Sequence, residues 1–301
     1  MNTKQFQYVL TLVREGSFSK AADTLNITQP SLSQYIKKIE NEIGLDLFDR
    51  TNGDVRITDA GKVYIEAGRK ILDLERQMEN SFTDLVNNKT GSLIIGAAPY
   101  RAASMMPEIA KQFQIKHPGM YLIVREGTTT ELVEGMEHGE YDLALTILPV
   151  DERVFNYERI VEEELVLAVP SSYVPFSTVL EKSRKFPAVN ANVLNNQSIV
   201  MLTNAQFMQK QLENLRIDYN LSFRPAAVVK SLEAQIEMVK AGVGMALMPS
   251  GIERFCKDDP VTFYSFMDDL PKREVVLIWR KDHKLSNVAE ELKEVIRSIQ
   301  W

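Results

Sequence analysis

Apolar residues near the N-terminus recur at helical spacing in two short segments. The recurring positions are Phe18, Ala21, Ala22 and Leu25 in the first segment, and Leu32, Ile36 and Ile39 in the second. Between them, Thr28 stands where a helix N-cap is expected, and Pro30 falls in the first turn, where its missing N–H is not needed. The pattern predicts two short helices joined by a tight turn.

The second predicted helix directs polar side chains away from its apolar positions. They carry amide, hydroxyl and ammonium groups, which suit base edges and phosphates: Gln29, Ser31, Ser33, Gln34, Lys37 and Lys38. In a helix-turn-helix the second helix enters the major groove of DNA with its N-terminal residues. We therefore predict DNA contacts along this helix, including Pro30. The alternative is a helical hairpin with a solvated face.

A hairpin is predicted after these helices. Asn52-Gly53 lies between two short runs that can pair, which is the strongest short-range signal for a two-residue hairpin turn. Arg50 and Arg56 flank the turn. A basic hairpin beside a helix-turn-helix is placed to contact phosphates or the minor groove as a wing. A plain surface hairpin is the alternative, but the two signals in tandem favour DNA binding.

One long helix is predicted from Thr58 to about Asn88. Apolar residues in it follow alternating steps of four and three, the spacing of a coiled-coil seam. The seam positions that we expect to make a dimer are Tyr64, Ala67, Ile71, Leu74 and Met78. The alternative is an apolar stripe packed on the helix's own chain. The segment "NNKTGS", residues 87–92, then marks a domain boundary.

From Ser92 onward, predicted strands alternate with predicted helices. The strands of the first series are "LIIGAA", "YLIVRE" and "DLALTI", and "ELVLAVP" ends this series near Pro170. The strands of the second series are "SIVML", "PAAVV" and "GMALMP". This alternation predicts βαβ units, mainly parallel sheets and two α/β lobes with a cleft between them. The last strand, "EVVLIWR", and the helix after it are expected to return to the first lobe.

The stretch from about Phe6 to Gly61 resembles the N-terminal domain of the LysR-type transcriptional regulators. The residues that carry the resemblance are "GSFSKAADTLNITQPSLSQYIKKIENEIGLDLFDRT" and "VRITDAG". They combine a helix-turn-helix near the N-terminus, an "LF-acidic-R" step and a "T-acidic-AG" step. One departure is Gln34, where many members carry a basic residue, so we expect a different site preference.

The resemblance extends over all 301 residues and implies three parts. They are a winged helix-turn-helix domain over 1–58, a linker and dimerisation helix over 59–89, and an effector-binding domain over 90–301. The last resembles the type II periplasmic-binding-protein fold, with lobe I at about 90–164 and 266–301 and lobe II at about 165–265.

Four loops of the predicted lobes are candidate effector contacts. Ligands of such sheets bind at the carboxyl ends of strands and at helix N-termini, and the resemblance implies effector contacts at the same places. The candidates are Pro99, Tyr100, Arg101, Thr128, Thr129, Thr203, Asn204, Val243 and Gly244. Helix starts with hydroxyls, and Arg101, favour an anion. The alternatives are simple helix capping by the threonines, more so for Thr130 than for Thr128, and a solvated Arg101.

Charge and cysteine content set limits on this interpretation. The net charge is −6, and residues 1–89 hold 12 Lys and Arg against 13 Asp and Glu, so any attraction to DNA must be local. Cys256 is the single cysteine, which excludes an intramolecular disulfide, argues against a two-cysteine redox switch and fits a reducing cytoplasm. No stretch approaches the ~18 apolar residues of a membrane span.

Motifs for catalysis are missing from the sequence. It has no G-x-S-x-G, no P-loop and no complete dinucleotide fingerprint, and its three histidines are not spaced as metal ligands. We therefore predict a sequence-specific transcriptional regulator, with no cofactor, that responds to a small anionic effector. Its expected partners are a two-fold DNA operator, further copies of itself as dimer or tetramer, and RNA polymerase. The alternative is an α/β solute-binding protein or enzyme with an unrelated helical dimerisation module.

Overall fold

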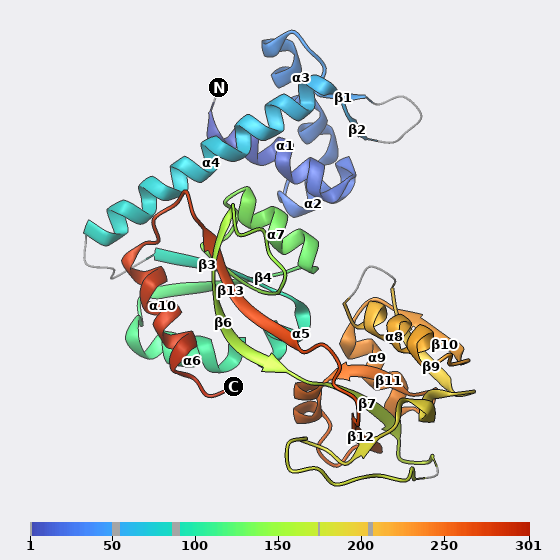
Figure 1. Cartoon of the computed structure of the whole chain (residues 1–301). Coiled ribbons are helices and arrows are strands. Elements are labelled where there is room, and N and C mark those ends of the chain that lie inside the picture. Colours follow the sequence, from blue (N-terminus) through green and yellow to red (C-terminus); the bar gives the residue numbers. More distant parts are fainter. Residues whose placement is uncertain (1, 50–54, 86–90, 174, 204–206) are drawn as a thin grey trace.

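The computed structural model describes residues 2–49, 55–85, 91–173, 175–203 and 207–301. A helical N-terminal domain leads into one long helix, which runs along the first of two α/β lobes (Figure 1). Among the described residues, no helix is both long enough and apolar enough to span a bilayer.

Three helices form the N-terminal domain: α1 (Thr3–Glu15), α2 (Phe18–Thr24) and α3 (Gln29–Ile43). Helix α1 ends at Gly16, which adopts the left-handed conformation, and α3 ends in the same way at Gly44. Thr28 caps α3 as predicted, because its hydroxyl accepts a hydrogen bond from the backbone N–H of Ser31 at 3.3 Å. The apolar positions of both predicted helices lie in this core, including Ala21, Ala22, Leu32, Ile36 and Ile39.

A short antiparallel hairpin follows α3. Its strands are β1 (Phe48–Asp49) and β2 (Arg56–Ile57), and residues 50–54, with Asn52-Gly53 and Arg50, lie outside the described residues. The carboxylate of Glu40 in α3 is buried and accepts hydrogen bonds from the backbone N–H groups of Leu47 and Phe48, at 3.0 and 3.2 Å. The entry into the hairpin is therefore tied directly to α3.

Helix α4 (Asp59–Leu85) packs on the N-terminal domain with its first turns, and its residues Tyr64 and Ile65 belong to that domain's core. The hydroxyl of Thr58 caps it by accepting from the N–H of Gly61 at 3.0 Å. Tyr64 is buried with its ring centre 5.0 Å from that of Phe6. At Gly68, an added Cβ would lie 2.6 Å from the Phe6 ring, so α1 and α4 are in close contact.

Lobe I contains a five-stranded sheet in the order β4-β3-β5-β13-β6. Strands β3 (Gly91–Ala97), β4 (Met120–Glu126) and β5 (Leu143–Ile147) are parallel, while β13 (Arg273–Arg280) runs antiparallel between β5 and β6 (Phe155–Glu163). The expected return of the last strand to lobe I is thus confirmed. Its helices are α5 (Pro99–Ser104), α6 (Met106–Lys116), α7 (Thr129–Glu137) and α10 (Asn287–Ser298).

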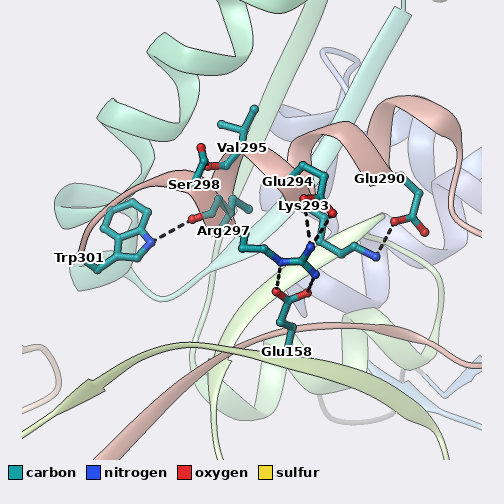
Figure 2. A network of polar contacts seen from close by, with 9 residues as sticks. Glu158, Glu290, Lys293, Glu294, Val295, Arg297, Ser298 and Trp301 are labelled. Atoms are coloured by element: carbon teal, nitrogen blue, oxygen red, sulfur yellow. Dashed lines mark hydrogen bonds and ion pairs between the residues drawn. The ribbon is translucent and has the colours of Figure 1, made fainter.

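Helix α10 also returns to lobe I and is held there by apolar and charged contacts. Apolar residues of α6 and α10 share one core on a face of the sheet, while Met136 of α7 packs on the other face. Arg297 of α10 donates to Glu158 of β6 at 2.8 Å, and the indole N–H of Trp301 donates to the carbonyl oxygen of Ile296 at 3.1 Å (Figure 2). The bond to Glu158 fastens the C-terminal helix to the last strand before the crossover, and the Trp301 bond holds the chain end against α10.

Lobe II has a four-stranded sheet, β11-β7-β12-β8, and a parallel pair, β9 and β10. The strands are β7 (Leu165–Pro170), β8 (Ala188–Val189), β9 (Ser198–Leu202), β10 (Arg224–Val229), β11 (Ala246–Pro249) and β12 (Val261–Phe266). Helices α8 (Phe207–Asp218) and α9 (Leu232–Lys240) complete the lobe, with two 3-10 helices, η2 (Ala191–Leu194) and η3 (Ser250–Phe255).

The prediction of mainly parallel sheets is wrong for the four-stranded sheet. Both β11 and β12 pair with β7 in the antiparallel direction. Apolar runs mark where strands lie, but the direction of pairing depends on connections that a run does not encode.

Candidate functional site

The outward side of α3 carries the predicted DNA-contacting residues. Exposed on it are Gln29, Pro30, Ser31, Gln34, Lys37 and Lys38, while Ser33 is half-buried. The hydroxyls of Ser31 and Thr28 lie 2.7 Å apart. Lys37 is paired with Asp46 at 3.0 Å, so part of its charge is neutralised within the chain. Hydroxyl, amide and cationic groups thus share one accessible helix face beside a buried opposite face.

The hairpin lies beside α3 in Figure 1. Arg56 on β2 is exposed there, while Arg50 lies outside the described residues. Helix face and hairpin together have the layout of a winged helix-turn-helix, in which a helix enters the major groove and an adjacent basic hairpin reaches the backbone.

A row of apolar side chains is exposed along α4. Val63, Leu74, Met78 and Phe82 are each more than half exposed, and Ile71 lies between them at 38 %. Ala67 is exposed in the same row. Tyr64 does not belong to this row, because it is buried against Phe6. The regular heptad pattern pointed to Tyr64 since apolar spacing does not distinguish a contact with the chain's own domain from one with a second chain.

The start of α7 shows how one predicted effector contact, Thr128, is used within the fold. The hydroxyl of Thr128 accepts from the N–H of Glu131 at 3.3 Å, and the carboxylate of Glu131 accepts from the N–H of Thr128 at 2.7 Å. This reciprocal pair is a capping box. Thr128, rather than Thr130, is the cap of α7, which begins at Thr129. The hydroxyls of Thr128 and Thr129 remain on exposed residues.

Helix α5 places a charged group at the crossover between the lobes. Arg101 is only 3 % exposed and forms a two-point ion pair with Glu163 of β6, with Nη1 donating to Oε1 at 2.9 Å. The alternative of a solvated Arg101 is therefore wrong. Tyr100 beside it is also buried, its hydroxyl 3.5 Å from Glu163, while Pro99 is exposed.

Sequence reasoning missed two members of this crossover cluster, Glu163 and Arg273. They pair across β6 and β13, and Nη1 of Arg273 lies 3.8 Å from Oε2 of Glu163. One carboxylate therefore faces two buried guanidinium groups. Glu163 is the last residue of β6 and Arg273 is the first residue of β13. The signal that could have revealed them is therefore a charged residue at the strand end where the chain crosses between the lobes.

The charges in this cluster change the protonation of its members. Burial alone would raise the pKa of Glu163, but the hydrogen bonds and charge of Arg101, assisted by Arg273, hold that pKa below its ordinary value. Burial, and then the neighbouring charge of Arg101, lower the pKa of Arg273 to about 10. Burial and the negative charge of Glu163 raise the pKa of Tyr100 to about 12.

Lobe II meets α5 at this same cluster. The ring of Tyr100 lies edge-on to that of Phe255, with centres 6.1 Å apart, and Arg254 donates to the carbonyl oxygen of Ser104 at 2.9 Å. An added Cβ at Gly251 would lie 2.7 Å from the hydroxyl of Tyr100. Helix α5 therefore contacts both lobes.

The remaining predicted positions lie in lobe II. Thr203 follows β9 and its N–H donates to the carbonyl oxygen of Val229 at 3.1 Å, and Asn204 lies outside the described residues. Val243 is 41 % exposed. Gly244 is buried, and an added Cβ would lie 2.5 Å from the carbonyl oxygen of Ser198. Close approach to the backbone of Ser198 therefore requires a glycine at this position.

Among the described residues, no group of three or more His, Cys, Asp or Glu side chains could hold a metal ion. The single cysteine, Cys256, is buried, and burial raises the pKa of its thiol. A thiol of this kind is a poor nucleophile, because the thiolate is the reactive form.

Known proteins with this organisation are transcriptional regulators. Residues 3–62 match the bacterial regulatory helix-turn-helix family of the lysR type, and residues 87–300 match the LysR substrate binding domain. The HTH-type transcriptional regulator YcgK of Bacillus subtilis is 28 % identical, over 99 % of this chain and 94 % of its own. The hydrogen peroxide-inducible genes activator of Haemophilus influenzae is 26 % identical, over 99 % and 98 %.

Solved structures share the fold. The LysR family regulator CbnR covers 99 % of this chain and 98 % of its own at a TM-score of 0.68, with 20 % identity. Full-length CbnR in complex with its target DNA covers 99 % of both chains at 0.66. The second family model matches well over half of the chain, and with the first it spans nearly all of it. The protein therefore belongs to the LysR family, and it is a DNA-binding transcriptional regulator with an effector-binding domain rather than an enzyme.

Proposed function

We propose that the protein binds a two-fold operator as a dimer and responds to a small anionic effector held between its lobes. The exposed polar face of α3 and the β1–β2 hairpin support DNA contacts by Gln29, Pro30, Ser31, Ser33, Gln34, Lys37, Lys38, Arg50 and Arg56. The exposed apolar row of α4 supports pairing of two chains. Two DNA-binding domains related by a two-fold axis require half-sites about one helical turn apart, or a multiple.

The crossover cluster is the main observation in favour of an anionic effector. Two buried guanidinium groups, Arg101 and Arg273, share the single carboxylate of Glu163, and Arg254 adds a third positive charge nearby. Such an excess of buried positive charge favours an anion, because it has no equal counter-charge within the cluster. Because the guanidinium group of Arg101 is paired with Glu163, Arg101 would attract the effector by its positive charge rather than as an unpaired side chain.

The proposed effector contacts come from four segments of the two lobes, one of which, the start of α5, holds Arg101 of this cluster. They are Pro99, Tyr100, Arg101, Thr128, Thr129, Thr203, Asn204, Val243 and Gly244. Two segments belong to lobe I and two to lobe II, so a ligand that touches both would favour one arrangement of the lobes by its difference in affinity.

The signal that this protein senses is proposed to differ from oxidation of a cysteine pair. Some relatives are hydrogen peroxide-inducible genes activators. This chain has one cysteine, Cys256, which is buried and whose Sγ lies 3.6 Å from the carbonyl oxygen of Ile252. The chain therefore has no second cysteine with which Cys256 could form an intramolecular disulfide. We further propose a cytoplasmic protein without a cofactor, assembled as a dimer or as a tetramer of two dimers, that contacts RNA polymerase.

Footprinting on the DNA upstream of its own gene tests the operator. We expect two protected half-sites on one face of the duplex. A uniform, sequence-independent footprint would contradict specific binding.

A thermal-shift screen of the full-length protein tests the effector class. Small carboxylates should raise the melting temperature, whereas the matching neutral amides should not. A carboxylate that raises the melting temperature of the wild-type protein should no longer do so in the Arg273→Gln variant. Stabilisation by amides and carboxylates alike would contradict an anionic effector without affecting the DNA result.

A further inference from the structure

Helix α4 has a third face that neither the N-terminal core nor the exposed apolar row uses. At about 100° per residue, Asp73 lies roughly 200° around the helix from Ile71, on the side opposite the apolar row. Arg69 lies one turn earlier on the same side. Asp73 is only 7 % exposed although it lies in the long helix, so something outside α4 covers it.

Lobe I covers Asp73 and supplies its partner. The carboxylate oxygen Oδ2 accepts from Nη1 of Arg280, the last residue of β13, at 2.7 Å. The Asp73 and Arg280 side chains are 8 % and 14 % exposed. Arg280 also donates to Asp282 at 2.8 and 3.1 Å, but that carboxylate is 73 % exposed and belongs to lobe I itself. The bond to Asp73 therefore joins two parts of the protein, and the bond to Asp282 does not.

A glycine makes room for this ion pair. Gly139, in the turn between α7 and β5, has a φ of +68°, which L side chains rarely adopt. An added Cβ there would lie 2.1 Å from Oδ1 of Asp73 and 2.8 Å from Nη1 of Arg280. The turn of lobe I thus closes directly over the carboxylate of α4.

A second bond lies one helical turn away. Nη1 of Arg69 is 2.8 Å from Nε2 of His138, the C-cap residue of α7. A guanidinium only donates, so this ring nitrogen accepts and the imidazole is neutral. Burial, and then the charge of Arg69, lower the pKa of His138, while a hydrogen bond to the backbone of Glu134 and the charge of Glu66 act in the opposite direction. The two bonds define a latch between α4 and lobe I, formed by Arg69, Asp73, His138, Gly139 and Arg280.

We propose that this latch holds lobe I and the DNA-binding domain as one unit, so that lobe II is the part that moves when the effector domain responds. Its position supports this, because Gly68 is in contact with Phe6 of α1 and Asp73 lies only five residues further along a continuous helix. Five helical residues span about 7.5 Å, a short and stiff connection. The apolar row faces the other way, so dimerisation leaves the latch intact.

A charge-swap experiment in the full-length protein tests the physical contact. Asp73→Arg and Arg280→Asp should each speed hydrogen exchange in residues 69–75 and 137–141, and the double swap should slow it again. Asp282→Asn is the matched control, since it removes the other carboxylate of Arg280 and should leave exchange in 69–75 unchanged. Folded single variants with wild-type exchange, or a double swap that restores nothing, would overturn the latch.

A pair of glycine variants separates contact from backbone strain. Gly139→Ala introduces strain and a clash with Asp73, whereas Gly242→Ala introduces strain at a φ of +78° with no atom within 4 Å of the new Cβ. We expect only Gly139→Ala to speed exchange in residues 69–75. Equal behaviour of the two variants in that segment would contradict the contact.

Footprints on the DNA upstream of its own gene test transmission. With lobe I released, Asp73→Arg should still protect each half-site but lose the wild-type pattern between them, and the double swap should recover it. An unchanged pattern despite faster exchange would overturn the transmitting role. A wild-type protein that shows no footprint there would instead count against the proposed operator, and the exchange data would still decide the latch.

Discussion

The crossover cluster and the outward face of α3 both rely on charged and polar side chains, yet they place these groups in opposite environments. Arg101 and Glu163 are at most 7 % exposed, whereas Lys37 and Asp46 of the α3 region are more than half exposed. An exposed ion pair contributes little to stability, while a buried pair that loses one partner leaves an uncompensated charge. Changes at the crossover should therefore affect folding, and changes on α3 should affect DNA binding alone.

Removal of the shared carboxylate should have the largest effect. Glu163→Gln leaves Arg101 and Arg273 buried beside each other without a counter-charge, and we expect a loss of about 3–5 kcal/mol in the free energy of unfolding. Chemical denaturation of the full-length protein measures it. A loss below about 1 kcal/mol would show that the crossover behaves like an exposed pair.

A charge in the exposed apolar row of α4 should abolish dimers without unfolding the chain. Leu74→Asp places a carboxylate where we expect the partner helix, and sedimentation should show monomers with wild-type circular dichroism. Glu75→Gln, one position along, is the control and should stay dimeric. A folded Leu74→Asp protein that remains dimeric would assign the row another role.

Removal of a side chain that reads bases should weaken binding to the cognate site but not binding to random DNA. Gln34→Ala should weaken binding to the cognate site by about 1–3 kcal/mol and leave binding to random DNA nearly unchanged. Arg56→Ala should weaken both about equally, because phosphate contacts carry no sequence information. Titrations on both DNAs at one salt concentration compare them. An equal loss on both DNAs for Gln34→Ala would show that Gln34 does not read bases.

Acid should distinguish the two environments as well. Because the folded pKa of Glu163 lies below its ordinary value, the unfolded chain takes up the proton first as pH falls. The stabilisation by this carboxylate is complete above about pH 4.5 and is lost as pH drops through the folded pKa. Glu163→Gln should flatten that limb of the stability curve. A limb of unchanged slope would assign it to other carboxylates.

The exposed pair of α3 should show the smallest effect. Asp46→Asn removes the partner of Lys37 and should change the free energy of unfolding by less than about 1 kcal/mol. It also frees Lys37, so affinity for bulk DNA at low salt should rise slightly. A large loss of stability would mean that Asp46 has a structural role beyond this pair.

The helix-turn-helix could be predicted from the sequence because its signals are local. The Thr28 cap and the apolar positions of α2 and α3 depend on residues within a few positions of one another. The alternation of strands and helices predicted two α/β lobes, and the family resemblance added their fold class, which is confirmed.

The crossover and the latch could not be predicted because their partners are distant in sequence. Arg101 meets Glu163 across 62 residues, and Asp73 meets Arg280 across 207. The sequence singled out Arg101 as a candidate contact for an anion, but it did not show that Glu163 is the partner of its guanidinium group. Similarly, apolar spacing placed Tyr64 in a dimer seam, although its ring packs against Phe6 of the same chain.

The buried carboxylate of Glu40 joins α3 to the first residues of the hairpin through two backbone hydrogen bonds. Since Glu40 is fixed in α3, the helix and the hairpin cannot shift relative to each other without breaking those bonds. If α3 enters the major groove and the hairpin contacts the neighbouring backbone, as proposed, these two contacts would be held at a fixed separation. Duplexes whose groove width does not match that separation would then bind less well, even where the mismatch lies at base pairs that no side chain touches.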